Sequence, residues 1–359
     1  MPLTTTTIGA FPKPKSTPVQ DWFLGSKSDE EKKASKGLLA NWSPGAYEKA
    51  LEEAGENAEK LFLQAIEEVV TDQVNAGIDV PTDGEVRRES YVLYQCRFLN
   101  GISFKEVTHK SVRQGAFEAD LPTIIGPISS KEVRLHHDWK SAQQFTKKPL
   151  KITLPGPMTI TDSIANNYYD DLKKLGFDFA MALNKEVKAL VDAGCQYIQV
   201  DEPVFARKPE QAIEYGMENL ERTMHGIPKE VQRVCHICCG YPNSLDSEGY
   251  KKADLDAYDR IADLVDQSSI DEVSLEDSHR HNDLSLLEKF EKTKVIFGVI
   301  DIARSRMEDV EEVRSRILDA LNHIDENRLI AAPDCGLGFF SRDQAIEKMS
   351  ILSKAAKSI

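Results

Sequence analysis

The sequence predicts an α/β fold, specifically a (β/α)8 TIM barrel. Eight short apolar runs of β-like composition recur along the 359 residues. Longer stretches with helical periodicity lie between them, and residues 46–75 are the clearest case, with apolar side chains near 3.6-residue spacing. Strands that alternate with helices indicate a parallel sheet. Eight such units favour a closed barrel, and a doubly wound open sheet is the alternative.

The β-like runs follow one another with two interruptions. In chain order they span residues 3–12, 77–85, 150–157, 194–203, 231–239, 270–277, 294–301 and 328–336. Residues 13–45 precede the first long helix and are expected to form an irregular arm. Residues 97–135 are expected to form a β-hairpin insertion after the second unit. Because no linker divides the chain, we expect residues 1–359 to form a single domain.

Composition excludes several classes of protein. The formal net charge is -14, which argues against nucleic acid as a partner because phosphate binding needs a basic face. The sequence contains no run of about 18 apolar residues, so it predicts no membrane span. The N-terminus lacks the pattern of a signal peptide. Six cysteines are too few for a disulfide framework. We therefore expect a cytoplasmic protein with no membrane partner.

The stretch "RVCHICCGYP", residues 233–242, concentrates soft metal ligands in one apolar run. Positions i and i+2 of a strand point to the same side. His236 and Cys238 therefore share one face, whereas Cys235 and Cys239 share the other. In a parallel barrel the active site is built from the carboxyl ends of the strands. The pair stands at such an end, although two buried core residues would produce the same pattern.

Two further residues at strand ends turn this pair into a candidate zinc site. Cys335 ends the eighth run and Glu276 ends the sixth, so the four side chains can provide the tetrahedral nitrogen and thiolate set that zinc prefers. An exchangeable carboxylate ligand would let a substrate thiol reach the metal. A zinc-bound thiol loses its proton near neutral pH. The pattern therefore points to alkylation of a thiol.

Two acids end other apolar runs. Glu85 lies in "PTDGEVRR" and Asp201 in "IQVDEP". Each could cap a helix or form a structural ion pair. Next to a metal, the two together could instead hold the ammonium group of an amino acid. The sequence leaves both interpretations open.

These residues lie within motifs that resemble a known family. The chain is similar to the catalytic C-terminal half of cobalamin-independent methionine synthase, from near residue 3 to near residue 350. The resemblance rests on the order and spacing of "TTTTIGAFP", "VNAGIDVPTDGEVRRESYV", "LPGPMTI", "YIQVDEP", "HIC", "VSLEDS" and "APDCGLG".

The resemblance implies a (β/α)8 barrel and a methyltransferase that makes methionine from homocysteine. It implies zinc bound by His236, Cys238, Glu276 and Cys335. It also implies that homocysteine is held by the first-strand loop and by two acids, namely Ile8, Gly9, Ala10, Glu85 and Asp201. The implied methyl donor is a methyl-folate or a methylated corrinoid protein.

The methyl-donor half of the motif set departs from the family. The folate-stacking tryptophan of the family aligns with Ser163, and an acidic folate contact aligns with Arg207. The general-acid histidine of the family aligns with Ala303. His279 and His281, in "EDSHRHND", are the substitutes that the sequence offers for this acid, although solvated loop histidines are the simpler interpretation.

Three functions remain after these comparisons of motifs. The first is methyl transfer to homocysteine. The second is zinc-dependent alkylation of another small thiol, as in epoxyalkane:coenzyme M transferases. The third is a zinc-binding barrel without catalysis, supported mainly by the missing histidine. The retained acids Glu85 and Asp201 favour an amino-acid thiol and hence the first function.

Overall fold

The computed structural model describes residues 2–21, 43–112, 117–242, 244–247 and 252–359. Its centre is a parallel sheet in the order β3-β5-β6-β7-β8-β9. Each strand pairs with the next in parallel register. The strands are β3 (Lys151–Pro155), β5 (Tyr197–Asp201), β6 (Gln232–Ile237), β7 (Glu272–Glu276), β8 (Lys294–Ile300) and β9 (Leu329–Pro333).

Two short segments close this sheet into a ring. Thr5 bridges in parallel to Ala331 of β9, Thr6 bridges to Val80, and Thr82 bridges to Lys151 of β3. These two segments lie within the first two predicted runs and bring the number of strand positions in the barrel wall to eight. We call each of these strand positions a stave. The (β/α)8 barrel is therefore confirmed, and each of the eight runs predicted from the sequence contributes to its wall.

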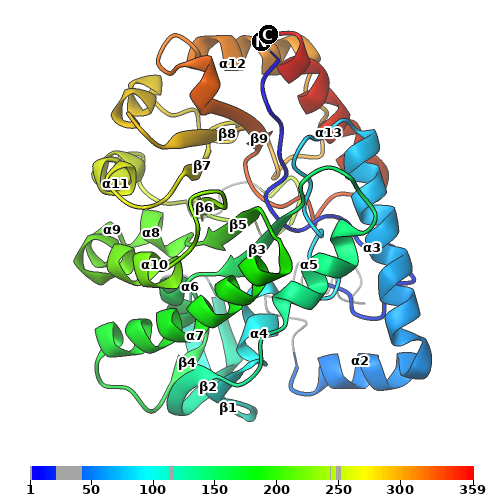
Figure 1. The fold of residues 1–359 in the computed structure, drawn as a ribbon, viewed down its shortest axis with the longest axis vertical. Coiled ribbons are helices and arrows are strands. Elements are labelled where there is room, and N and C mark those ends of the chain that lie inside the picture. Colours follow the sequence, from blue (N-terminus) through cyan, green and yellow to red (C-terminus); the bar gives the residue numbers. More distant parts are fainter. Residues whose placement is uncertain (1, 22–42, 113–116, 243, 248–251) are drawn as a thin grey trace.

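Helices surround the barrel (Figure 1). Those that follow the first two staves are α2 (Ala46–Ala54), η1 (Gly55–Asn57), α3 (Ala58–Asn75), α4 (Tyr91–Cys96) and α5 (Leu135–Gln143). Those that follow β3 and β5 are α6 (Pro157–Ser163), α7 (Leu172–Ala193), α8 (Val204–Arg207), α9 (Pro209–Gln211), η2 (Ala212–Gly216) and α10 (Met217–Thr223). The rest are α11 (Ala257–Asp266), η3 (Leu284–Lys289), α12 (Val310–Ala320), η4 (Glu326–Arg328) and α13 (Arg342–Lys357).

The structure refines the helical pattern at two places. The predicted helix 46–75 is interrupted at Gly55, whose φ of 53° lies in the left-handed region that glycine tolerates. The stave β7 is followed by the 3₁₀-helix η3 in place of an α-helix. Across the described residues no helix is both long and apolar enough to cross a membrane.

The predicted insertion is confirmed as a β-hairpin. Strands β1 (Leu99–Val112) and β2 (Phe117–Ser130) pair antiparallel, and the short strand β4 (Ala165–Asn166) adds to β2. In Figure 1 the hairpin lies at the end of the molecule opposite α12. The predicted arm, residues 13–45, falls largely outside the described residues. Its first part, residues 13–21, is described and is not helical.

Side chains divide between the inside of the barrel and the layer under the helices. Ile8, Val234, Ile296, Ile330 and Ala332 form a separate small cluster inside the barrel. The neighbouring Cys235, Ile237 and Cys239 belong to the large outer core instead. This alternation along β6 directs His236, two residues after Val234, toward the barrel interior.

Candidate metal and amino-acid site

Three soft ligands come together at the carboxyl ends of two staves. His236 lies on β6, Cys238 follows that strand, and Cys335 follows β9. One potential ligand atom from each lies within 4.8 Å of the other two. The Cys335 sulfur is 3.4 Å from Nε2 of His236. A tetrahedral ion with bonds of about 2.0–2.3 Å holds its ligand atoms roughly 3.3–3.8 Å apart. The donor set of the cluster therefore suits zinc, and the distance between Cys335 and His236 lies within this range.

The histidine of this cluster is held as a neutral imidazole. Its Nδ1 lies 2.9 Å from Oγ of Ser274, which leaves Nε2 directed at the cluster. Burial, with a smaller contribution from the charge of Lys151, lowers the pKa of His236 to about 3. A metal would therefore not compete with a proton for this nitrogen near neutral pH.

Glu276 lies beside the cluster and contacts one of its members. Cys238 Sγ donates to Oε1 of Glu276 at 2.9 Å. The other carboxylate oxygen is 2.6 Å from the ammonium of Lys252. Glu276 is fully buried but is not among the three residues whose ligand atoms all lie within 4.8 Å of one another. Its position is that of a neighbour within reach of the site.

The two acids singled out from the sequence are both buried, and they lie close enough for the charge of one to act on the other. Thr153 Oγ1 donates to Glu85 at 3.0 Å, and Gln199 Nε2 donates to Asp201 at 2.7 Å. Burial raises the pKa of Asp201 well above its usual range, and the nearby charge of Glu85 raises it further. Gly9 packs against Glu85 so closely that a Cβ there would lie 2.8 Å from Oε1.

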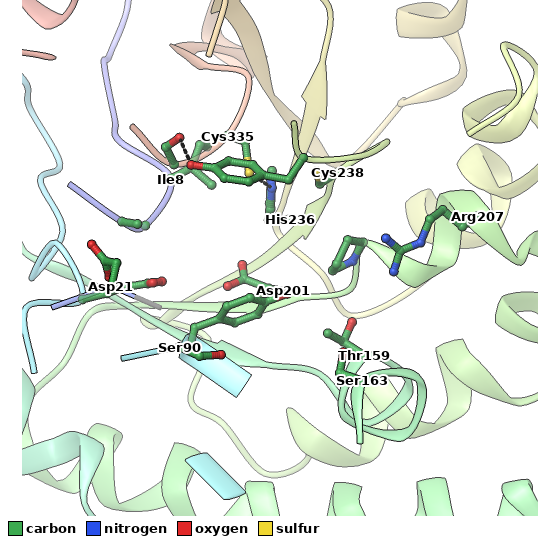
Figure 2. A pocket seen from close by; sticks show the side chains of 17 residues that line it. Ile8, Asp21, Ser90, Thr159, Ser163, Asp201, Arg207, His236, Cys238 and Cys335 are labelled. Carbon is green, nitrogen blue, oxygen red and sulfur yellow. Dashed lines mark hydrogen bonds between the residues drawn. The ribbon is translucent and has the colours of Figure 1, made fainter. Parts of the chain in front are cut away.

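One cavity is lined both by the soft cluster and by these acids. Its lining comprises Ile8, Gly9, Ala10, Asp21, Glu85, Ser90, Tyr91, Thr159, Ser163, Asp201, Pro203, Arg207, His236, Cys238, Tyr241, Cys335 and Gly336. Figure 2 shows Asp21 and Arg207 on opposite sides of it, with Asp201 between them and the soft cluster above. The cavity thus has an acidic side, a wall formed by the soft cluster, and a basic side.

Comparison with known proteins shows which family the chain belongs to. The model of the "Cobalamin-independent synthase, Catalytic domain" family matches residues 45–358. The chain belongs to this family.

Two kinds of relative agree with the family assignment. Methionine synthase of Saccharolobus solfataricus is 29% identical, over 99% of this chain and 95% of its own length. A methionine synthase of Saccharolobus islandicus is 30% identical with the same coverage. The structure of a B12-independent methionine synthase from Shewanella sp. W3-18-1, in complex with selenomethionine, superposes with a TM-score of 0.83. It is 30% identical and covers 100% of this chain and 98% of its own.

Membership in the cobalamin-independent synthase family identifies the chain as a methyltransferase. It thereby removes the non-catalytic barrel from the three functions that the sequence allowed. A methyltransferase from Methanosarcina mazei, only 12% identical, shares the fold with a TM-score of 0.55.

The two histidines offered as substitutes for the family's general acid stand apart from the cavity. The ring of His279 lies 3.3 Å from a carboxylate oxygen of Asp301. His281 is exposed and has a φ of 47°. Neither is among the residues that line the cavity. Their role as a general acid is therefore still a prediction.

Sequence reasoning missed Asp21, which completes the acidic side of the cavity. The carboxylate is 5% exposed. Its Oδ1 is 2.8 Å from the ammonium of Lys13, and its Oδ2 has no hydrogen-bond partner among the described residues. Asp21 follows no apolar run, so no strand-end signal marks it. Thr159, Tyr91 and Tyr241 also line the cavity without having been predicted.

Proposed function

We propose that this methyltransferase transfers a methyl group to the thiol of homocysteine and so forms methionine, with zinc as its metal. The observation that carries the proposal is one cavity lined by both the soft cluster and three buried acids, Asp21, Glu85 and Asp201. A small molecule that carries both a thiol and an ammonium group suits these two features. Homocysteine is such a molecule.

The proposed zinc ligands are His236, Cys238 and Cys335, with Glu276 as the fourth. When bound, zinc would lower the pKa of a substrate thiol so that the sulfur is a thiolate near neutral pH. Ser274 fixes the orientation of the His236 ring. Partners of this kind hold a ligand in position and increase its affinity for the metal.

The acidic side of the cavity would hold the amino group. Glu85 and Asp201 are buried carboxylates that would accept hydrogen bonds from an ammonium, and a charge so placed relieves the cost of burying two acids together. The loop of Ile8, Gly9 and Ala10 would contact the rest of the amino acid. These side chains fix the substrate so that its sulfur faces the incoming methyl carbon. The new S–C bond then forms as the donor's bond to that carbon breaks.

Replacement of Asp201 tests the amino-acid part of this proposal. We expect Asp201→Asn to weaken homocysteine binding about tenfold to a hundredfold, since a charge-assisted hydrogen bond contributes roughly 1.5–3 kcal/mol. Isothermal titration of the zinc-loaded protein measures this. The matched control is 2-mercaptoethanesulfonate, which has the thiol but no amino group, and its affinity should not fall.

The same titration separates the first function from the second. Homocysteine should bind the unmodified protein much more tightly than 2-mercaptoethanesulfonate does. Equal affinity for the two thiols would favour alkylation of another thiol, as in the epoxyalkane:coenzyme M transferases. Formation of methionine from homocysteine, assayed with methylcobalamin and with methyltetrahydrofolate, is the direct test of the reaction.

Zinc affinity should depend on pH in a way that identifies its ligands. Cys335 forms a hydrogen bond with Cys238, and this bond together with burial raises the pKa of the Cys335 thiol well above its usual range. A thiol releases its proton when it binds zinc. Two thiols therefore predict an affinity that rises up to about a hundredfold per pH unit between about pH 5 and 8. His236, whose pKa is about 3, adds no proton. Chelator competition at several pH values measures this slope, and a slope near three protons below pH 6 would contradict the assigned state of His236.

A further inference from the structure

A cluster of basic residues lies beside the cavity around one carboxylate. The ammonium of Lys208 is 2.6 Å from Oδ1 of Asp162, and the guanidinium of Arg207 is 3.6 Å from Oδ2. The ammonium of Lys110, on the hairpin strand β1, donates to the backbone carbonyls of Asp162 at 3.1 Å and Ile164 at 2.8 Å. Among the described residues, three cations thus gather around Asp162, in a chain whose net charge is -14.

This basic cluster, Lys110, Arg207 and Lys208, spans two cavities. Arg207 lines the cavity that holds the metal ligands. Lys110 and Lys208 line a second cavity between the hairpin, the end of α6 and α8. Asp162 lines the second cavity and is in contact with Arg207. The positive charge therefore continues from the site of chemistry into the neighbouring cavity.

The described residues that line the second cavity carry more positive than negative charge. Asp162 is the one acid among the described residues that line it. Burial lowers the pKa of Lys110, and the charge of Lys208 lowers it further against the opposing effect of Asp162. The two ammonium groups are therefore close enough to repel each other. An anion placed between them would remove this repulsion and would gain from the low dielectric of a partly enclosed site.

We propose that the basic cluster binds an anionic group of the methyl donor, either a carboxylate or a phosphodiester. The inference rests on the proposed methyl transfer. That reaction places the reactive methyl group of the donor at the soft cluster, and the anionic part of the donor would then lie beyond Arg207. Figure 2 shows Arg207 on the side of the cavity away from Asp21, near Thr159 and Ser163. The acidic side would thus take the ammonium of the thiol substrate, and the basic side would take the donor.

The test is donor binding to the zinc-loaded protein with Lys110→Ala and Lys208→Ala combined. Methyltetrahydrofolate with one or three glutamates provides carboxylates, and methylcobalamin provides a phosphodiester. We expect at least one of these donors to bind about tenfold more weakly to the double variant, as the loss of charge-assisted contacts predicts. Homocysteine should bind with unchanged affinity. Lys289→Ala is the matched control, since Lys289 pairs with Asp259 outside both cavities.

The pattern of losses identifies the anionic group. A preference for three glutamates that disappears in the double variant assigns the cluster to carboxylates. A loss confined to methylcobalamin assigns it to the phosphodiester. Unchanged affinity for all three donors would overturn the proposal.

A second measurement needs no variant. The affinity of the unmodified protein for the bound donor should fall as KCl rises from about 0.05 to 0.5 M, because salt screens such contacts. Salt-independent donor binding would likewise contradict an anion site. All of these are binding measurements, so they stay informative even if no donor yields methionine. A failure of every donor to yield methionine would instead count against the proposed reaction.

Discussion

Replacing Cys238 by serine is expected to remove zinc and to reduce methyl transfer by at least about a thousandfold. A serine hydroxyl is a poor zinc ligand at neutral pH, and the change leaves only His236 and Cys335 of the three clustered ligands. Loss of the metal forfeits several kcal/mol of catalysis, which corresponds to a rate factor of about 10³ or more. Elemental analysis after dialysis measures the metal, and methionine formation measures the reaction.

The same strand provides the control. Cys235 is buried in the outer core, on the opposite face of β6 from His236. Cys235→Ala should keep one zinc per chain and lose only about 1–3 kcal/mol of stability from packing. The assignment of the metal site would be wrong if the Cys238→Ser protein kept stoichiometric zinc through dialysis.

The second large effect concerns the methyl donor. Free methyltetrahydrofolate is expected to react slowly or not at all, whereas methylcobalamin should react faster. A tertiary amine leaves poorly unless it is protonated, and a positioned general acid contributes about 10²–10⁴-fold. Ala303 has no proton to give, and its backbone N–H donates to Asp301. Initial rates with the two donors, at saturating homocysteine, measure the difference.

The histidines decide how this result is interpreted. If His279 or His281 supplies the proton, the combined His279→Ala and His281→Ala variant should lose any activity with methyltetrahydrofolate and keep its activity with methylcobalamin. Rapid methionine formation from methyltetrahydrofolate, unaffected by that double replacement, would refute the inference drawn from Ala303.

The barrel could be predicted because its signals are local. Each stave is a short apolar run, and the chemical residues follow those runs at fixed positions. The spacing of His236 and Cys238 decides which face they share before any tertiary contact is known. Glu85 and Asp201 were identified in the same way, from polar residues that end apolar runs. Their convergence at one mouth then follows from the parallel topology.

What the sequence could not reveal depends on packing between distant segments. Asp21 reaches the cavity on an arm whose Lys13 pairs with Asp21 and donates to the backbone carbonyl of Arg88, and no periodic pattern encodes that approach. The basic cluster is divided between a hairpin strand and a helix end, Lys110 and Lys208, which are far apart in the chain. His279 turns toward Asp301 and not into the cavity, a side-chain choice that sequence spacing does not determine.

Closure of the ring by Thr5 and Thr6 also brings together the two sides of the candidate site. The bridge from Thr5 to Ala331 joins segments near the two ends of the chain, and contacts so distant in sequence carry the largest loop-closure cost. Ile8, Gly9 and Ala10 continue directly from the bridging segment, and Cys335 continues directly from β9. A growing chain therefore has no complete cavity until its last stave is made. The cavity is therefore complete only when the segment at Thr5 has paired with β9.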